Sequence, residues 1–103
     1  MPNPNYKMGR RFEYLRKRHW ENKGYAVIRA SGSHGVFDLV CIPRKNKGPV
    51  VCVQCKRTKD LAVARRLMRD FESNPPLPVG EHQQILEVGV TGEREIRSVT
   101  VGA

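Results

Sequence analysis

The chain has 103 residues, of which 39% are hydrophobic and 28% are charged, and this composition is typical of a globular protein with one hydrophobic core. Nineteen lysines and arginines oppose ten acidic residues, so the net charge is +9 and nucleic acid is the first partner to consider. A membrane-spanning protein is excluded at this level, because no apolar stretch approaches the roughly 20 residues that cross a bilayer.

The N-terminal segment 1–8 is rich in proline and asparagine, which predicts a mobile arm ahead of a single domain over 1–103. Lys7 makes this arm basic, and Arg10 and Arg11 follow it directly. No apolar stretch or small-residue cleavage site follows, as a secretory signal would require. Three cysteines, an odd number, also favour reduced thiols. We therefore expect an intracellular, cytoplasmic protein.

The hydrophobic pattern predicts two helices and five strands. Apolar residues recur at helical spacing over 9–22 and again after Asp60, a typical helix N-cap, as far as Phe71. Segments rich in β-forming residues, bounded by glycine, proline or polar turns, predict strands at 25–30, 37–42, 50–56, 83–90 and 95–101. The predicted fold is α/β in the order αβββαββ, with a central mixed sheet flanked by helices and strands two and three paired antiparallel.

Three polar residues on the predicted hairpin suggest phosphodiester chemistry. Gln54 and Lys56 share one face of their strand because side chains alternate, and the hairpin can place Asp38 beside them. A carboxylate and an amide oxygen suit Mg²⁺ or Mn²⁺, and an ammonium can offset the charge that builds on a phosphate. The alternative is a solvated polar strip, but the apolar stretch 50–53 predicts a strand buried on both faces, where polar residues require a reason.

The ordered motifs resemble those of the archaeal Holliday junction resolvases, within the PD-(D/E)xK nucleases. That family has a glycine four residues before a helix glutamate, a Gly-aromatic-Ala-Val strand, an Arg-Ala and Ser-Gly-Ser turn, a strand aspartate and an acid-x-Lys motif. The matching positions here are Gly9, Glu13, Gly24 to Val27, Arg29, Ala30, Ser31 to Ser33, Asp38 and Gln54 to Lys56. The resemblance covers 9–60, a little over half of the chain.

The resemblance implies a restriction-endonuclease-like fold and a Mg²⁺ or Mn²⁺ site formed by Glu13, Asp38 and Gln54. It also implies a catalytic Lys56, with Ser31 close to the scissile phosphate, and a homodimer that cuts opposed strands of a four-way DNA junction. Contacts to the DNA are expected from Lys7, Arg10, Arg11, Arg29, Ser33 and Arg57.

Gln54 departs from the family, which usually has an acid at this position. Some PD-(D/E)xK nucleases of the virus-type replication-repair class have glutamine there, so a nuclease acting on duplex or flapped DNA is an alternative. A DNA-binding module without catalysis is another. Glu13 alone also fits a surface ion pair with Lys17, four residues later on the helix.

Cys52 and Cys55 form a C-x-x-C spacing that in another setting would suggest zinc or redox chemistry. In a strand, however, this spacing directs the two sulfurs to opposite faces. Both cysteines are therefore predicted to be small core residues rather than ligands.

Overall fold

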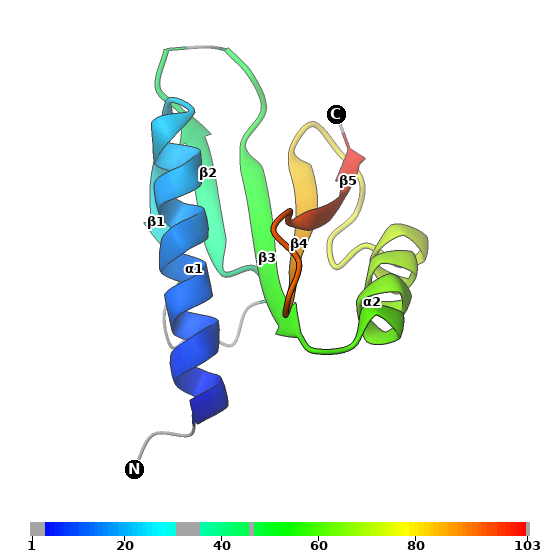
Figure 1. Cartoon of the computed structure of the whole chain (residues 1–103). Helices are drawn as coiled ribbons and strands as arrows, with labels where there is room; N and C mark the ends of the chain where they lie inside the picture. Colours follow the sequence, from blue (N-terminus) through cyan, green and yellow to red (C-terminus); the bar gives the residue numbers. More distant parts are fainter. Residues whose placement is uncertain (1–3, 31–35, 46, 103) are drawn as a thin grey trace.

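The computed structural model describes residues 4–30, 36–45 and 47–102, with side chains from residue 9 onward (Figure 1). The elements follow the predicted order: α1 (Pro4–Asn22), β1 (Tyr25–Arg29), β2 (Leu39–Pro43), β3 (Val51–Thr58), α2 (Leu61–Ser73), β4 (Gln83–Val90) and β5 (Arg97–Gly102). The predicted boundaries of β4 agree with the structure, and the other strands differ by one or two residues at either end. Neither helix in the described part of the chain is both long and apolar enough to span a membrane.

The five strands form one mixed sheet in the order β1-β2-β3-β4-β5. All neighbouring strands are antiparallel except β3 and β4, which run parallel because α2 connects them. Strand β3 is therefore the centre of the sheet, as the sequence predicted. This confirms the α/β class and the antiparallel pairing of β2 with β3.

Helix α1 begins at Pro4, which corrects the boundary of the arm predicted over 1–8. Proline is accepted in the first turn of a helix because its missing N–H would have no intrahelical partner there. The five residues from 4 to 8 thus extend the helix toward the end of the sheet where β3 finishes (Figure 1).

The two helices cover opposite faces of the sheet. On the α1 face, Trp20 packs against a buried cluster made of Leu39, Cys41, Val51, Val53 and Ile85. On the other face, Phe71 and Ala64 of α2 pack against Leu86, Val88 and Val90. The alternation along β4, with Ile85 facing α1 and Leu86 facing α2, shows that this strand is buried on both sides, as expected for the parallel part of a sheet.

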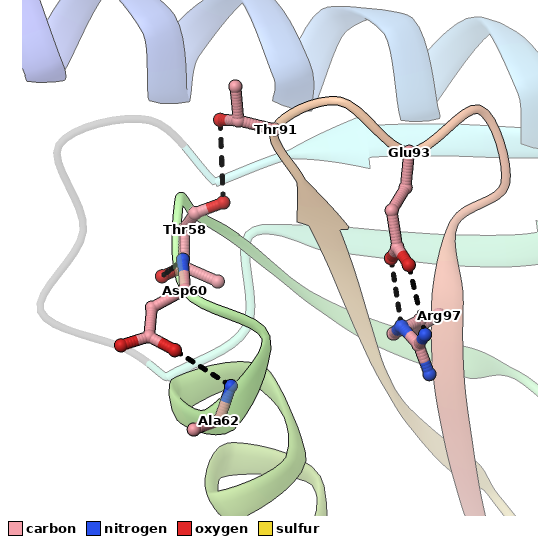
Figure 2. Close-up of polar contacts among 6 residues, drawn as sticks. All are labelled: Thr58, Asp60, Ala62, Thr91, Glu93 and Arg97. Carbon is pink, nitrogen blue, oxygen red and sulfur yellow. Dashed lines mark hydrogen bonds and ion pairs between the residues drawn. The ribbon is translucent and has the colours of Figure 1, made fainter.

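The turn between β3 and α2 is fixed by side chains (Figure 2). The Asp60 carboxylate accepts a hydrogen bond of 2.8 Å from the Ala62 N–H, which confirms the predicted N-cap. Thr58 accepts a hydrogen bond from the Asp60 N–H through its hydroxyl, and its carbonyl accepts one from the Thr91 N–H. The ends of the parallel strands β3 and β4 are thereby held together.

Helix α1 is attached to the sheet by a buried ion pair. The Arg16 guanidinium donates two hydrogen bonds of 2.8 Å to the Glu87 carboxylate on β4. The two side chains are only 14% and 5% exposed, so little solvent screens this pair. One turn earlier on the helix, the Phe12 ring packs over Gly89, where an added Cβ would lie 3.1 Å from the ring. These two contacts fix the position of α1 along β4.

We expect Glu87→Leu to lower the free energy of unfolding by about 3–5 kcal/mol, because the Arg16 charge would stay buried without its partner. The double variant Arg16→Met with Glu87→Leu should regain most of this loss, since no uncompensated charge remains. Chemical denaturation of the single and double variants measures both effects.

The matched control is Lys17→Met on the same helix. Lys17 forms an exposed pair with Glu21 at 3.3 Å, and loss of such a pair is expected to cost at most about 0.5 kcal/mol. A Glu87→Leu protein as stable as this control would contradict the proposed importance of the buried pair.

Candidate active site

Strands β2 and β3 separate after only three paired positions, Leu39–Cys41 against Val51–Val53. Strand β4, in contrast, accompanies β3 all the way to Thr58. Beyond Val53, no strand in the described part of the chain pairs with the β2 side of β3. We refer to this place, where β2 leaves β3, as the fork.

Asp38, the residue just before β2, lies in the fork. Its carboxylate oxygen Oδ2 accepts a hydrogen bond of 2.8 Å from the Cys55 N–H. Its own N–H donates to the Val53 carbonyl, and its carbonyl accepts from the Ala30 N–H, each at 2.9 Å. Three backbone contacts thus fix the Asp38 carboxylate in place, as preorganised chemistry requires.

Glu13 approaches Asp38 from α1. Burial raises the pKa of the Glu13 carboxyl, and the nearby negative charge of Asp38 raises it further, while Arg29 and Arg10 act in the opposite direction. The Arg29 Nε lies 3.5 Å from a Glu13 oxygen, a charge contact that is too poorly aligned for a hydrogen bond. Two carboxylates therefore repel each other at the fork, and the guanidinium groups of Arg29 and Arg10 partly compensate their charge.

Gln54 and Lys56 lie on β3 just past the last paired position, on the same face of the strand by its alternation. Gln54 is half-buried, between the two β3 residues that bond to Asp38. Lys56 is exposed and lines a cleft at the end of β3 together with Gly9, Arg57, Thr58, Lys59 and Thr91. Because Cys55 packs on the α1 side, Gln54 and Lys56 lie on the opposite face of β3, and the Lys56 ammonium borders open space at the end of the strand.

The thiol of Cys55 lies on the α1 side of β3, where it packs against the cluster around Trp20. Burial raises the pKa of this thiol, and the charges of Glu87, Asp38 and Glu13 raise it further. A thiol of this kind is a poor nucleophile and a poor ligand. Cys41, Cys52 and Cys55 are all free, and the opposite faces of Cys52 and Cys55 agree with the sequence-based prediction.

The structure separates the predicted DNA-contacting residues. Arg10, Arg11 and Arg57 are exposed, and the guanidinium of Arg57 lies 6.0 Å from the centre of the Phe12 ring. Arg29 is only 15% exposed, because it contacts Glu13 and lies over the Tyr14 ring at 4.5 Å. Its observed partners are protein groups. Ser31, Ser33 and the side chain of Lys7 lie outside the described residues.

The ionic partners of Glu13 and Glu87 differ from what the sequence predicted. The ionic partner of Glu13 is Arg29 on β1, while Lys17 pairs with Glu21 instead, so the surface-pair interpretation of Glu13 is wrong. Glu87 was missed, although one acid within the apolar stretch Gln83–Val90 is itself a signal that a buried partner is required.

In the part of the chain that the structure describes, no three His, Cys, Asp or Glu side chains gather into a metal-binding group. The two carboxylates at the fork would therefore need other oxygens to complete a coordination shell. Gln54 offers an amide oxygen from the β3 residue between the two that bond to Asp38, and Mg²⁺ commonly keeps several waters as well. The chemistry of these donors fits a hard divalent cation.

Comparison with known proteins agrees with this geometry. No curated protein matches the chain. Among solved structures, the Holliday junction resolvase Hjc of the archaeal hyperthermophile Archaeoglobus fulgidus has the same fold, with a TM-score of 0.56 and 19% sequence identity over 88% of this chain and 70% of that one. A family model described as restriction endonuclease (Mrr_cat) matches residues 7–74, which include most of α1, the fork and all of α2. The chain therefore belongs to the restriction endonuclease family, which confirms the nuclease class predicted from the sequence.

Proposed function

We propose that this protein is a divalent-metal-dependent DNA endonuclease that cuts branched DNA, with a four-way junction as its substrate. The observation that carries this proposal is the pair of carboxylates at the fork, Glu13 and Asp38, inside the region that matches the nuclease family. The net charge of +9 supports a polyanionic substrate. The fold of a Holliday junction resolvase supports the choice of a junction.

Glu13, Asp38 and Gln54 are the residues that would hold Mg²⁺ or Mn²⁺. A cation at this place would relieve the repulsion between the two carboxylates, which raises the pKa of Glu13 in the protein alone. When bound, the metal supplies Lewis-acid activation of the phosphodiester and lowers the pKa of a water molecule. The hydrogen bond from the Cys55 N–H would hold the Asp38 carboxylate in one orientation for a bound metal.

Lys56 is the group that would stabilise the reaction electrostatically. Its ammonium lies at the cleft border and can donate to the phosphate oxygens as their negative charge increases in the transition state. Ser31 is proposed to lie close to the scissile phosphate. Arg10, Arg11 and Arg57, with Lys7 and Ser33, are proposed to contact the DNA backbone, whose negative phosphates attract exposed guanidinium groups.

Symmetric cutting of a junction requires two active sites, so we propose that the protein acts as a homodimer inside the cell. Gln54 favours one alternative substrate, because an amide in place of an acid is also found in nucleases of duplex or flapped DNA. Cleavage of a junction compared with cleavage of its separate duplex arms distinguishes the two substrates.

We expect cleavage of a labelled four-way junction in Mg²⁺ or Mn²⁺, and a loss of at least about 100-fold in rate for Asp38→Asn and for Lys56→Met. Asparagine still offers an oxygen to the Cys55 N–H, so Asp38→Asn removes charge without removing that hydrogen bond. Lys56 is exposed, so its substitution should leave the fold intact. Gel analysis of the cleavage products measures both effects.

The control for Lys56→Met is Lys17→Met, which removes the same charge from a surface pair on α1. Cleavage that continues unchanged in Asp38→Asn, or intact junctions with the unmodified protein, would refute the nuclease assignment. Metal-independent but salt-dependent binding would instead identify a DNA-binding module.

Gln54→Glu tests the third position of the site. A carboxylate there adds one negative charge beside Glu13 and Asp38, so we expect tighter metal binding and equal or faster cleavage at low metal concentration. Titration with Mn²⁺ measures the affinity directly. Weaker binding of Mn²⁺ by Gln54→Glu would show that Gln54 is not a ligand.

Glu13→Gln should stabilise the metal-free protein at neutral pH. Because burial and Asp38 raise the pKa of Glu13 in the folded state, its carboxylate opposes folding once the pH exceeds that pKa, and a neutral amide avoids this cost. The gain should shrink as the pH falls through this raised pKa and should disappear below the ordinary glutamate pKa of 4.5, where both side chains are neutral. Thermal unfolding at several pH values without metal measures this difference.

The same variant should lose most of the stabilisation that Mn²⁺ gives the unmodified protein, since the site then carries one negative charge fewer. Glu21→Gln, at an exposed position of the same helix, is the control for both measurements. If Glu13→Gln were less stable at neutral pH and still stabilised by Mn²⁺, Glu13 would be a structural residue only.

A further inference from the structure

A second basic surface lies at the opposite end of the sheet from the fork. We call it the distal basic patch and define it as Lys23, Arg44 and Lys45. Asp38 precedes β2 at one end, whereas Arg44 follows Pro43 at the other. Figure 1 shows the end of β2 beside the C-terminal end of α1, at the far side of the molecule from the end of β3.

The patch is built by backbone contacts between two segments. Tyr25 at the start of β1 pairs with Pro43 at the end of β2, and the Arg44 N–H donates to the Gly24 carbonyl at 3.2 Å. This contact brings the turn after α1 next to the turn after β2. Lys23 and Lys45, 22 positions apart in the sequence, therefore border the same surface cleft.

The cleft of the patch has no negative charge to balance its cations. Its lining consists of the three patch residues with Gly24, Tyr25, Pro43 and Gly48, none of them acidic. All three cationic side chains are exposed, and within the described residues none of them forms an ion pair. The acid on the last turn of α1, Glu21, is already paired with Lys17. Lys47 adds a further exposed cation nearby.

The cleft is lined by positive charges only, which suits a ligand with regularly spaced negative groups. The Lys23 ammonium lies 5.5 Å from the centre of the Trp20 ring, so its position is partly fixed before any ligand arrives. A cation whose position is already restricted loses less entropy on binding. Phosphates of a nucleic-acid backbone have the matching charge and spacing.

We propose that the distal basic patch binds backbone phosphates of the same DNA arm that is cut at the fork. Asp38 and Arg44 are six residues apart along an extended strand, which corresponds to about 20 Å. Along B-DNA this distance corresponds to about six base pairs. The patch therefore serves as a second anchor that aligns an arm with the active site. The proposal rests on the assignment of DNA as the substrate.

The test removes the three patch charges together, as Lys23→Gln, Arg44→Gln and Lys45→Gln in one protein. The control removes three exposed charges of α2, as Arg65→Gln, Arg66→Gln and Arg69→Gln, so that both proteins have the same net charge. Binding of a junction with long arms is measured by fluorescence anisotropy without divalent metal, at several salt concentrations. Thermal unfolding confirms that both proteins are folded.

Each phosphate contact that is lost should reduce the slope of log affinity against log salt by about 0.9. We expect the patch variant to lose about two to three units of slope and at least about ten-fold in affinity near 0.1 M salt. The control should lose less than about one unit. Equal losses in both variants would show that only the net charge matters, which would overturn the proposal. An unchanged slope in the patch variant would overturn it as well.

Arm length gives a second, independent measurement. Junctions with hairpin-capped arms of about four base pairs are too short to reach from the fork to the patch, whereas arms of about fourteen base pairs are long enough. The patch variant should therefore lose affinity for long arms only. An equal loss for short arms would mean that the patch contacts DNA elsewhere, which refutes the anchor.

The two proposals fail in different ways. Binding is measured without metal, so a protein that never cleaves DNA can still show the predicted loss of slope. Conversely, the patch variant should cleave bound junctions at an unchanged rate when protein is saturating, because its active site is intact. A slower rate at saturation would show that the patch acts on the chemistry rather than on binding, and would overturn its role as an anchor.

Discussion

The hydrogen bond between the Asp38 carboxylate and the Cys55 N–H, 2.8 Å long, is the contact on which the active end of the sheet depends. Strand β2 stops pairing at Leu39, so the backbone of β3 loses its neighbour on that side just where β4 continues. A buried backbone donor without a partner costs about 1–3 kcal/mol. Asp38 supplies the missing acceptor, and in doing so it is fixed with its charge inside the fork. The same residue thus stabilises the fold and sets the geometry proposed for metal binding.

Local patterns in the sequence predicted the features that depend on local physics. Alternation and turn residues gave the boundaries of β4, and Asp60 marked the start of α2 because its carboxylate bonds to the Ala62 N–H. The start of α1 was misplaced because proline and asparagine suggest an arm, whereas proline fits the first turn of a helix. For Asp38, the predicted hairpin of strands two and three was enough to place it next to this part of β3, although not to predict its bond to the Cys55 N–H.

Ion pairs between distant segments escaped prediction because their partners are not neighbours in sequence. Arg16 and Glu87 are 71 positions apart, and nothing local in the sequence of α1 distinguishes the half-buried Arg16 from the exposed cations of that helix. Glu13 is a second example. Helical spacing predicted Lys17 as its ionic partner, whereas the partner in the structure is Arg29 on β1. The buried pair lies one turn from Glu13, so we expect the contact that holds α1 on β4 to influence how closely Glu13 approaches Asp38.

The amide at position 54 changes the charge balance of the proposed site in a way that the structure makes understandable. Glu13 and Asp38 together carry two negative charges, which one divalent cation would neutralise. A third carboxylate would leave an excess negative charge next to the phosphate that must approach, and Arg29 is already engaged with Glu13. With Gln54, the cation and the two carboxylates would together be neutral and would repel DNA less. Weaker retention of the metal is the expected cost, while the exposed cations around Lys56 and at the distal basic patch would supply DNA affinity that does not depend on the metal.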